Sequence, residues 1–299
     1  MDNAANPTQP LSSDQDANAL IHQLCESDNQ HCDEIVERLA VLADDAVFPL
    51  IERLAAHSDS YVDPVAPRLR RALSCLGAAA VSPLIERLSY AHRPLWDHVV
   101  YTLVRISTPS AITAVIEQVR TLTEDVSFQF LDADGFEITE NDENLNHISV
   151  QGSQWEILET SITNVGPTVL PLLRPFLHDT DRRLRHFAVN VLTWIGDQYG
   201  SGYVLDDLLP QLGDADPVVR TAAAYGLQFF DEERAIPAWS AALHDPHPDV
   251  RWFAAGKLGT FQSVQVLDAL VRVRDNLAEA PAVRDAASWA IHEIQNSQP

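Results

Sequence analysis

The chain has 299 residues, and 46% of them are hydrophobic, which is enough to bury a substantial core. Its formal net charge is −23, from 43 acidic and 20 basic residues, and such a field repels phosphate backbones, so nucleic-acid binding is disfavoured. No run of about 18 apolar residues occurs, so the sequence predicts no membrane span. The acidity has two open interpretations: a surface for a basic partner or polyanion mimicry, or simple solvation.

The amino-terminal residues 1–16 are rich in Asn, Asp, Pro, Gln and Ser, and we expect them to form a disordered tail. They lack the basic and apolar regions of a signal peptide. Cys25, Cys32 and Cys75 are unevenly spaced, which favours free thiols in a reducing compartment. We therefore expect a cytoplasmic protein.

From residue 17 to residue 296 an apolar pattern recurs about once every 30 to 35 residues. Each recurrence starts at an anchor residue and has apolar residues three, seven and ten positions later, which are helical spacings. The eight anchors are Cys32, Ala66, Trp96, Trp155, Arg185, Arg220, Arg251 and Arg284. A period of this length is typical of stacked helix pairs. The sequence therefore predicts an all-α, right-handed α-solenoid of about eight helical pairs.

Each repeat is expected to hold two helices, the first of which begins near a recurring proline. Residues 47–54 and 81–88 share six of eight amino acids, and both have proline in the third position. Pro171 and Pro237 stand in similar apolar surroundings. Because proline has no N–H group, it suits the first turn of a helix, where that donor would be unpaired. We therefore expect the first helices to begin close to these prolines.

Between the helices of the later repeats lies an aspartate-rich turn. Asp179, Asp214 and Asp245 each stand six residues before an anchor arginine, and Ala278 breaks this pattern before Arg284. Aspartate beside a helix start caps free N–H groups, and an arginine in the helix can pair with a carboxylate of a stacked neighbour. We interpret the series as structural, with a binding track as the alternative.

The segment 248–259, with the sequence PDVRWFAAGKLG, resembles a HEAT repeat. The short form rich in arginine and alanine is similar to the HEAT-like repeats named after phycobilisome lyases. The resemblance covers roughly residues 18–296, although Ala66 and Trp96 stand where the family has arginine. It implies second helices that line a concave face, and it is compatible with many functions.

The anchors Trp96 and Trp155 are 59 residues apart, which leaves about 25 residues beyond one repeat. We expect the first helix of this repeat at 112–120 and the second from near Gln154, so an insertion lies at about 121–153. It has Asp-Gly between alternating apolar residues, which is a hairpin signal, and no lysine or arginine. Its candidate residues are Asp132, Asp134, Glu137, Glu140, Asp142 and Glu143.

The insertion is therefore predicted as an acidic loop or β-hairpin. It has three open interpretations: a solvated loop, an element that contacts a partner, or a calcium site. The spacing of its glycine and glutamates does not fit an EF-hand.

The sequence predicts no metal or catalytic site. Cys25 and Cys32, with His22 and His31, form the densest group of soft ligands, but they lack the paired spacing of a zinc site. Nothing resembles a nucleophile with its base, a phosphate loop or a dinucleotide fingerprint. A single His-Glu pair at 292–293 is not the repeated set of the HEAT-like deoxyhypusine hydroxylases. We assign no catalytic residue, metal or cofactor, and we favour a protein that is not an enzyme.

Candidate binding residues stand one and five positions after the anchors, on the helix face opposite much of the apolar column. Toward the end of the chain these positions are aromatic, which is unusual for solvent positions and typical of interface hot spots. The candidates are Asp97, Tyr101, His186, Asn190, Tyr225, Trp252, Asp285 and Trp289. The alternative is that the rings fill gaps between neighbouring helices.

We interpret the chain as a non-catalytic HEAT-repeat scaffold or adaptor that binds a protein or peptide on its concave face. The acidic insertion would steer a partner of basic charge. The alternative is a tetrapyrrole (bilin) lyase or chaperone-like protein, as the phycobilisome-lyase resemblance implies, with Asp285 or His186 meeting the pigment's nitrogens. A HEAT-like DNA glycosylase is disfavoured because it needs a basic groove. The oligomeric state is left open.

Overall fold

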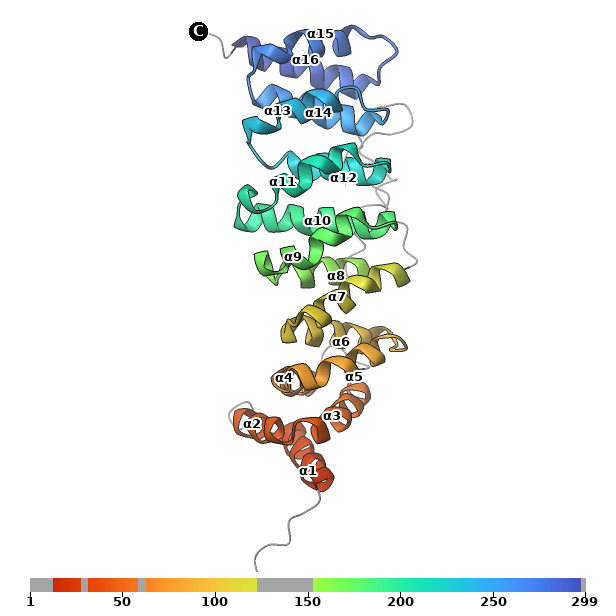
Figure 1. The fold of residues 1–299 in the computed structure, drawn as a ribbon, viewed down its shortest axis with the longest axis vertical. Coiled ribbons are helices and arrows are strands. Elements are labelled where there is room, and N and C mark those ends of the chain that lie inside the picture. Colours follow the sequence, from red (N-terminus) through yellow and green to blue (C-terminus); the bar gives the residue numbers. More distant parts are fainter. Residues whose placement is uncertain (1–12, 28–31, 59–62, 123–152, 297–299) are drawn as a thin grey trace, which may run out of the picture. The chain divides into compact units, whose positions relative to one another are not determined.

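The computed structural model describes residues 13–27, 32–58, 63–122 and 153–296. Every regular element in these ranges is an α-helix or a 3-10 helix (Figure 1). The chain divides into two compact units, residues 1–115 and 116–299, which are described one at a time. The loop or β-hairpin expected at 121–153 lies almost entirely outside the described residues, as do its six acidic candidates.

The first unit contains helices that alternate between two layers. The helices α2, α4 and α6 contact one another in series, and α1, α3 and α5 form the other layer. Consecutive helices pair as α1 with α2, α3 with α4 and α5 with α6. Their bounds are α1 Ser13–Glu26, α2 Cys32–Leu42, α3 Asp44–Ala56, α4 Ala66–Cys75, α5 Ala78–Leu88 and α6 Arg93–Ile106.

The second unit follows the same plan, and each of its second helices contacts the next. These second helices are α8 Gln154–Thr163, α10 Arg182–Tyr199, α12 Pro217–Leu227, α14 Pro248–Thr260 and α16 Pro281–Asn296. The first helices are shorter and adjoin 3-10 turns. The α-helices among them are α9 Leu170–Leu173, α11 Leu205–Leu208, α13 Ile236–Ala242 and α15 Leu267–Asp275. The 3-10 turns are η1 Gln118–Thr121, η2 Gly166–Val169, η3 Arg174–His178, η4 Ser201–Tyr203, η5 Leu209–Gly213, η6 Glu233–Ala235 and η7 Val264–Val266. Helix α7 (Pro109–Glu117) spans the boundary between the two units.

The predicted apolar column forms the core of both units. All sixteen residues that stand three and seven positions after the anchors are buried, with at most 9% of their surface exposed. At ten positions after the anchor, Leu42, Ile106, Val165 and Phe261 are partly exposed because they lie at or beyond helix ends. The predicted all-α solenoid is confirmed, while its handedness and number of pairs stay predictions.

The expected helix starts at proline are confirmed in the second unit and wrong in the first. Helices α9 and α13 begin one residue before Pro171 and Pro237. Helices α3 and α5 begin five residues before Pro49 and Pro83, so these prolines lie inside helices. Helix-forming residues upstream, such as the alanines at 78–80, extend each helix past its proline at the cost of one backbone hydrogen bond.

Helix α1 begins at Ser13, so the tail expected at residues 1–16 is wrong for its last four residues. Helix α7 with η1 covers the first helix expected at 112–120, and α8 begins at Gln154 as predicted. None of the described helices is long and apolar enough to cross a membrane.

Candidate functional site

Arginines tie the turns of the second unit together, as the aspartate–arginine series predicts. Arg185 donates from Nε and Nη2 to the carboxylate of Asp214 at 2.7 and 2.9 Å, and Arg220 donates likewise to Asp245 at 2.7 and 3.1 Å. The Nη1 atoms donate at 2.9 Å to the backbone carbonyls of Asp179 and Asp214, in each arginine's own turn. Each arginine therefore joins its own turn to the next one through a bidentate, charge-assisted pair.

The pairing continues where the sequence pattern lapses. Arg251 donates to the carboxylate of Glu279 at 2.9 and 2.6 Å, one residue after Ala278. The longer glutamate side chain thus takes the place of the missing aspartate. The Nε atom of the last anchor, Arg284, is buried and has no hydrogen-bond partner among the described residues. We call Arg185, Arg220 and Arg251, with their carboxylates, the arginine ladder.

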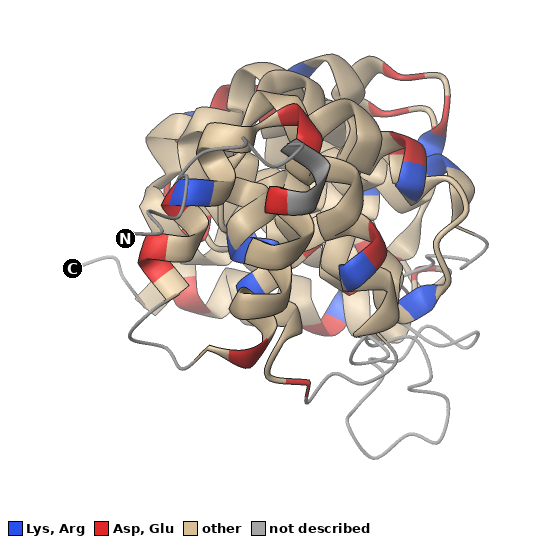
Figure 2. Ribbon diagram, turned by 90° about the horizontal axis from the view of Figure 1, so that it is seen from below, with Lys and Arg blue, Asp and Glu red and all other residues tan. Residues whose placement is uncertain are grey.

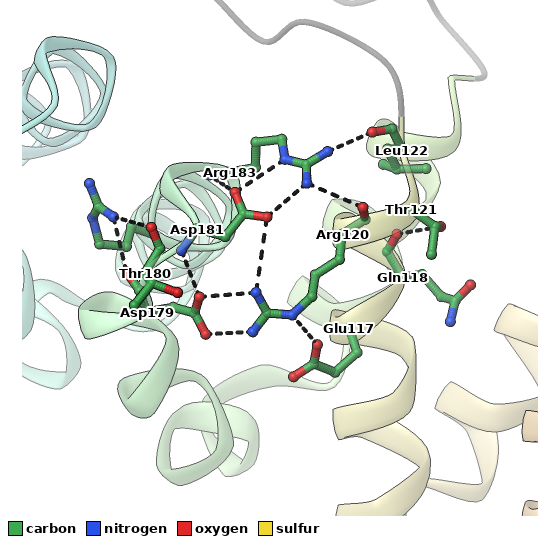
Figure 3. A network of polar contacts seen from close by, with 10 residues as sticks. Glu117, Gln118, Arg120, Thr121, Leu122, Asp179, Thr180, Asp181 and Arg183 are labelled. Carbon is green, nitrogen blue, oxygen red and sulfur yellow. Dashed lines mark hydrogen bonds and ion pairs between the residues drawn. The ribbon is translucent and has the colours of Figure 1, made fainter.

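An arginine that the repeat pattern did not identify makes a similar ion pair in the turn before the arginine ladder. Arg120 in η1 donates from Nη1 and Nη2 to the carboxylate of Asp179 at 3.1 and 2.6 Å (Figure 3). Its Nε donates to Glu117 at 2.5 Å. The carboxylate of Asp179 therefore has a guanidinium partner, just as Asp214 and Asp245 have theirs.

Both ends of the undescribed segment 123–152 are held by the second unit. On one side, Arg183 donates from Nη1 to the backbone carbonyl of Leu122 at 2.7 Å while it pairs with Asp181 (Figure 3). On the other side, Ser153 caps α8 with its side-chain oxygen. The segment carries eight of the 43 acidic residues and none of the 20 basic ones, whereas charges of both signs are interspersed on the described helices (Figure 2).

A pocket of about 640 Å³ opens on the second helices α14 and α16, next to the end of α12. We call it the aromatic pocket and define it by Trp252, Phe253, Gly256, Lys257, Asp285 and Trp289. Trp289 is 46% exposed, and Phe253 is 6% exposed. Three sequence-predicted candidates, Trp252, Asp285 and Trp289, therefore line one site.

Gly256 keeps the aromatic pocket open. A Cβ atom at this position would meet no atom within 4 Å. A Cβ atom at Gly259, one turn later, would lie 2.8 Å from the Cα atom of Ala290. The two glycines of α14 thus serve different purposes: Gly259 lets α16 approach closely, and Gly256 leaves room in the pocket.

The aromatic pocket carries one uncompensated negative charge. Lys257 is the single lysine of the chain, and only 4% of its side chain is exposed. Its Nζ atom donates to the carboxylate of Asp231 at 2.5 Å and to the carbonyl of Gln228 at 2.9 Å, so its charge is neutralised within the protein. Asp285 is exposed, and no cation among the described residues pairs with it.

Tyr225 of α12 packs against Phe253, one of the residues that line the aromatic pocket. Its ring meets Phe253 edge-on at 6.1 Å and Phe229 at 5.2 Å. Trp252 packs on Phe253 with a centroid distance of 4.8 Å. Burial raises the pKa of the Tyr225 phenol, which therefore stays neutral. Edge-to-face packing of this kind fixes the rings of the pocket wall.

His186 and Asn190 belong to a separate cluster around Trp155. The amide of Asn190 and the indole N–H of Trp155 donate to the same carboxylate oxygen of Glu159, at 2.8 and 2.5 Å. The His186 ring lies 5.5 Å from the Trp155 ring. Burial raises the pKa of Glu159 to about 7 and lowers that of His186 to about 3. We interpret this cluster as a packing network, because two internal donors occupy the carboxylate.

The solvent-facing position expected one residue after the anchor is wrong for Asp97 and His186, which are 1% and 2% exposed. At about 100° per residue, position five lies about 170° and position one about 150° around the helix from the centre of the apolar column, so position one is nearer the buried flank. Tyr101, at position five, is 43% exposed and lies under the Arg70 guanidinium at 5.6 Å. Position five is accessible throughout the second unit, at Thr160, Asn190, Tyr225, Gly256 and Trp289.

The sequence did not identify Lys257 or Phe253 as parts of a site. Lys257 is one residue beyond the accessible position of its repeat. The only signal in the sequence that could have identified it is that it is the single lysine of the chain.

The three cysteines are free thiols. Within the described ranges, no group of three or more His, Cys, Asp or Glu could hold a metal ion.

The stacked pairs and the arginine ladder define a helical repeat protein of the α-solenoid class. Residues 170–240 and 205–292 match the family model for HEAT repeats. Residues 170–292 of the chain therefore match HEAT repeats. The match does not single out the phycobilisome-lyase type, which stays a prediction.

No curated protein sequence matches the chain. Among solved structures, the chain is similar to YibA of Escherichia coli at 13% identity, with 98% of this chain and 100% of that chain covered and a TM-score of 0.42. Human deoxyhypusine hydroxylase in complex with glycerol matches at 19% identity over 95% and 98%, with a TM-score of 0.36. Designed armadillo repeat proteins for modular peptide recognition match at 14% identity over 93% and 99%, with a TM-score of 0.36.

Proposed function

We propose that the chain is a non-catalytic scaffold or adaptor that holds a protein or peptide partner at the aromatic pocket. The observation that supports this most is that Trp252 and Trp289, from two successive second helices, line one open pocket. Aromatic rings around a concave site are preferred anchors for a partner's side chain. The open space at Gly256 gives such a side chain a place to enter.

The test is to fill the pocket without disturbing the fold. Gly256→Phe places a ring in open space, whereas Gly202→Phe adds the same ring at a glycine outside the pocket where a Cβ atom also meets nothing within 4 Å. In affinity capture from a cell lysate, we expect the wild-type chain and Gly202→Phe to retain the same partner and Gly256→Phe to lose it. Equal capture by all three chains would refute the proposal.

We also propose that the acidic segment 123–152 steers a basic partner toward the second unit. The support is its charge and the two anchoring points at Leu122 and Ser153. Electrostatic steering acts on the association rate and is screened by salt. Association of the captured partner should slow steeply with added salt for the full chain, and less for a chain that lacks residues 123–151. The same salt dependence in both chains would contradict the steering role.

The same pocket supports the second candidate, binding of a tetrapyrrole. Trp252 and Trp289 offer flat surfaces, and Asp285 stands in the same lining. His186, the other residue considered for the pigment, is buried in the Trp155 cluster. Incubation with a bilin should then shift the pigment's absorption band for the wild-type chain and not for Gly256→Phe. An unchanged spectrum with the wild-type chain would discard this candidate.

A further inference from the structure

We propose that the guest of the aromatic pocket is the arginine side chain of a protein or peptide partner. This inference rests on the proposed function and adds the chemistry of the group that is recognised. It follows from two properties of the pocket, its charge and its aromatic walls.

The charge of the pocket favours a cation. Lys257 donates to the carboxylate of Asp231 and to the Gln228 carbonyl, which neutralises its charge, and only 4% of its side chain is exposed. Asp285 has no cationic partner among the described residues. A guest cation would therefore meet one carboxylate that is free to pair with it. The net charge of −23 adds a long-range attraction for cations.

The walls of the pocket favour a planar cation. Trp252 and Trp289 come from neighbouring helices, and tryptophan is the aromatic ring on which cations bind best. A guanidinium group is flat, stacks on an indole face and pairs with a carboxylate through two N–H groups. A lysine ammonium is strongly hydrated and offers neither the stacking nor the bidentate geometry. Asp285 in the same lining supplies the acceptor for that pair.

Two other kinds of guest fit less well. An anion would need the ammonium of Lys257, which is buried and already has two acceptors. An apolar side chain would cover Asp285 and leave a desolvated carboxylate without a partner, which is unfavourable. Arginine is the guest that uses both the rings and the carboxylate.

The experiment uses the full chain and four fluorescently labelled peptide pools. The pools have random flanking residues and a fixed central residue, which is arginine, lysine, citrulline or leucine. Citrulline has nearly the shape of arginine but no charge. We expect the arginine pool to bind at least about tenfold more tightly than the citrulline pool, with the lysine pool between them. Asp285→Asn should reduce binding of the arginine pool to the level of the citrulline pool.

A matched control separates failure of this inference from failure of the proposed function. Asp268→Asn removes an acidic residue from α15, outside the pocket, and should leave the preference for arginine unchanged. If all four pools bind the wild-type chain equally and Gly256→Phe abolishes their binding, the pocket is a binding site but the arginine inference is wrong. If no pool binds, or if Gly256→Phe binds as the wild type does, both the inference and the pocket's role are overturned.

Discussion

The two units of this chain hold their repeats together by different means. In the second unit, the ladder arginines and their carboxylates are nearly buried, with Arg220 and Asp245 at 10% and 7% side-chain exposure. In the first unit, the anchors are the apolar residues Cys32, Ala66 and Trp96. The comparison indicates that one repeat length can be maintained either by packing with exposed ion pairs, such as Arg71 with Asp33, or by packing together with nearly buried ion pairs in the turns.

The difference extends to the first helices of the repeats. Pro49 and Pro83 lie inside continuous helices in the first unit, whereas Pro171 and Pro237 start short helices after 3-10 turns in the second. A repeat whose first helix is short and interrupted has less regular backbone hydrogen bonding of its own. The arginine ladder supplies bonds between successive turns of that unit, and the aromatic pocket lies on the second helices that it connects.

The largest effect should follow from breaking the ladder. Arg220→Leu leaves the carboxylate of Asp245 buried without its guanidinium, and we expect a loss of about 3–5 kcal/mol in the free energy of unfolding of the second unit. Arg71→Leu in the first unit removes an exposed pair with Asp33 and should cost about 0–1 kcal/mol. Urea unfolding followed by circular dichroism measures both.

A second variant tests the reason for the loss. Arg220→Leu combined with Asp245→Asn removes the stranded charge while the asparagine can still accept the backbone N–H of His247. Part of the lost stability should return in this double variant. Equal losses for Arg220→Leu and Arg71→Leu would break the comparison between the two units.

The pH dependence of stability should come next. The pKa of Glu159 is raised from 4.5 to about 7 in the folded chain. Its contribution to the free energy of unfolding is therefore fully present below pH 4.5 and is lost as the pH rises through 7. The pKa of His186 is lowered from 6.5 to about 3. Its contribution to the free energy of unfolding is therefore present above pH 6.5 and is lost as the pH falls through 3. Between pH 5 and pH 8, the free energy of unfolding of Glu159→Gln should therefore rise by about 1–3 kcal/mol relative to that of the wild type.

Unfolding of the two chains at several pH values checks this prediction. The matched control is Glu293→Gln in α16, which removes a carboxylate outside the Trp155 cluster. A difference between Glu159→Gln and the wild type that stays constant from pH 5 to pH 8 would contradict the assignment to Glu159.

The repeat architecture could be predicted from the sequence because burial imposes a period on every repeat. Two residues illustrate this pattern. Val99, three residues after the anchor Trp96, is 0% exposed, and Leu227, seven residues after the anchor Arg220, is 1% exposed. The pairing of Arg185 and Arg220 with the following turns was predictable because an aspartate recurs in each turn, six residues before an anchor arginine.

The aromatic pocket was only partly predictable. Trp252, Asp285 and Trp289 stood out because they occupy solvent positions of regular helices. The role of Gly256 depends on the absence of atoms around it, and the neutralisation of Lys257 depends on Asp231, which lies 26 residues away in sequence. Arg120 was missed because it pairs with Asp179 across an insertion that breaks the repeat period.

The two glycines of α14 should respond in opposite directions to alanine. Gly259→Ala places a Cβ atom 2.8 Å from the Cα atom of Ala290 and should destabilise the second unit by about 1–3 kcal/mol. Gly256→Ala adds a methyl group in open space and should stabilise α14 by about 0.5–1 kcal/mol. Thermal and urea unfolding measure both. A loss of stability in Gly256→Ala would show that the pocket is narrower than the structure indicates.

The smallest effect should occur at the end of the ladder. Arg284 occupies the same repeat position as Arg220, but no following turn offers its Nε a carboxylate among the described residues. Arg284→Leu should therefore change the free energy of unfolding by no more than about 0.5 kcal/mol, since it removes no stabilising pair. The comparison with Arg220→Leu isolates the carboxylate, because both substitutions delete the same side chain at equivalent positions. If Arg284→Leu costs as much as Arg220→Leu, then Arg284 makes a stabilising pair in solution.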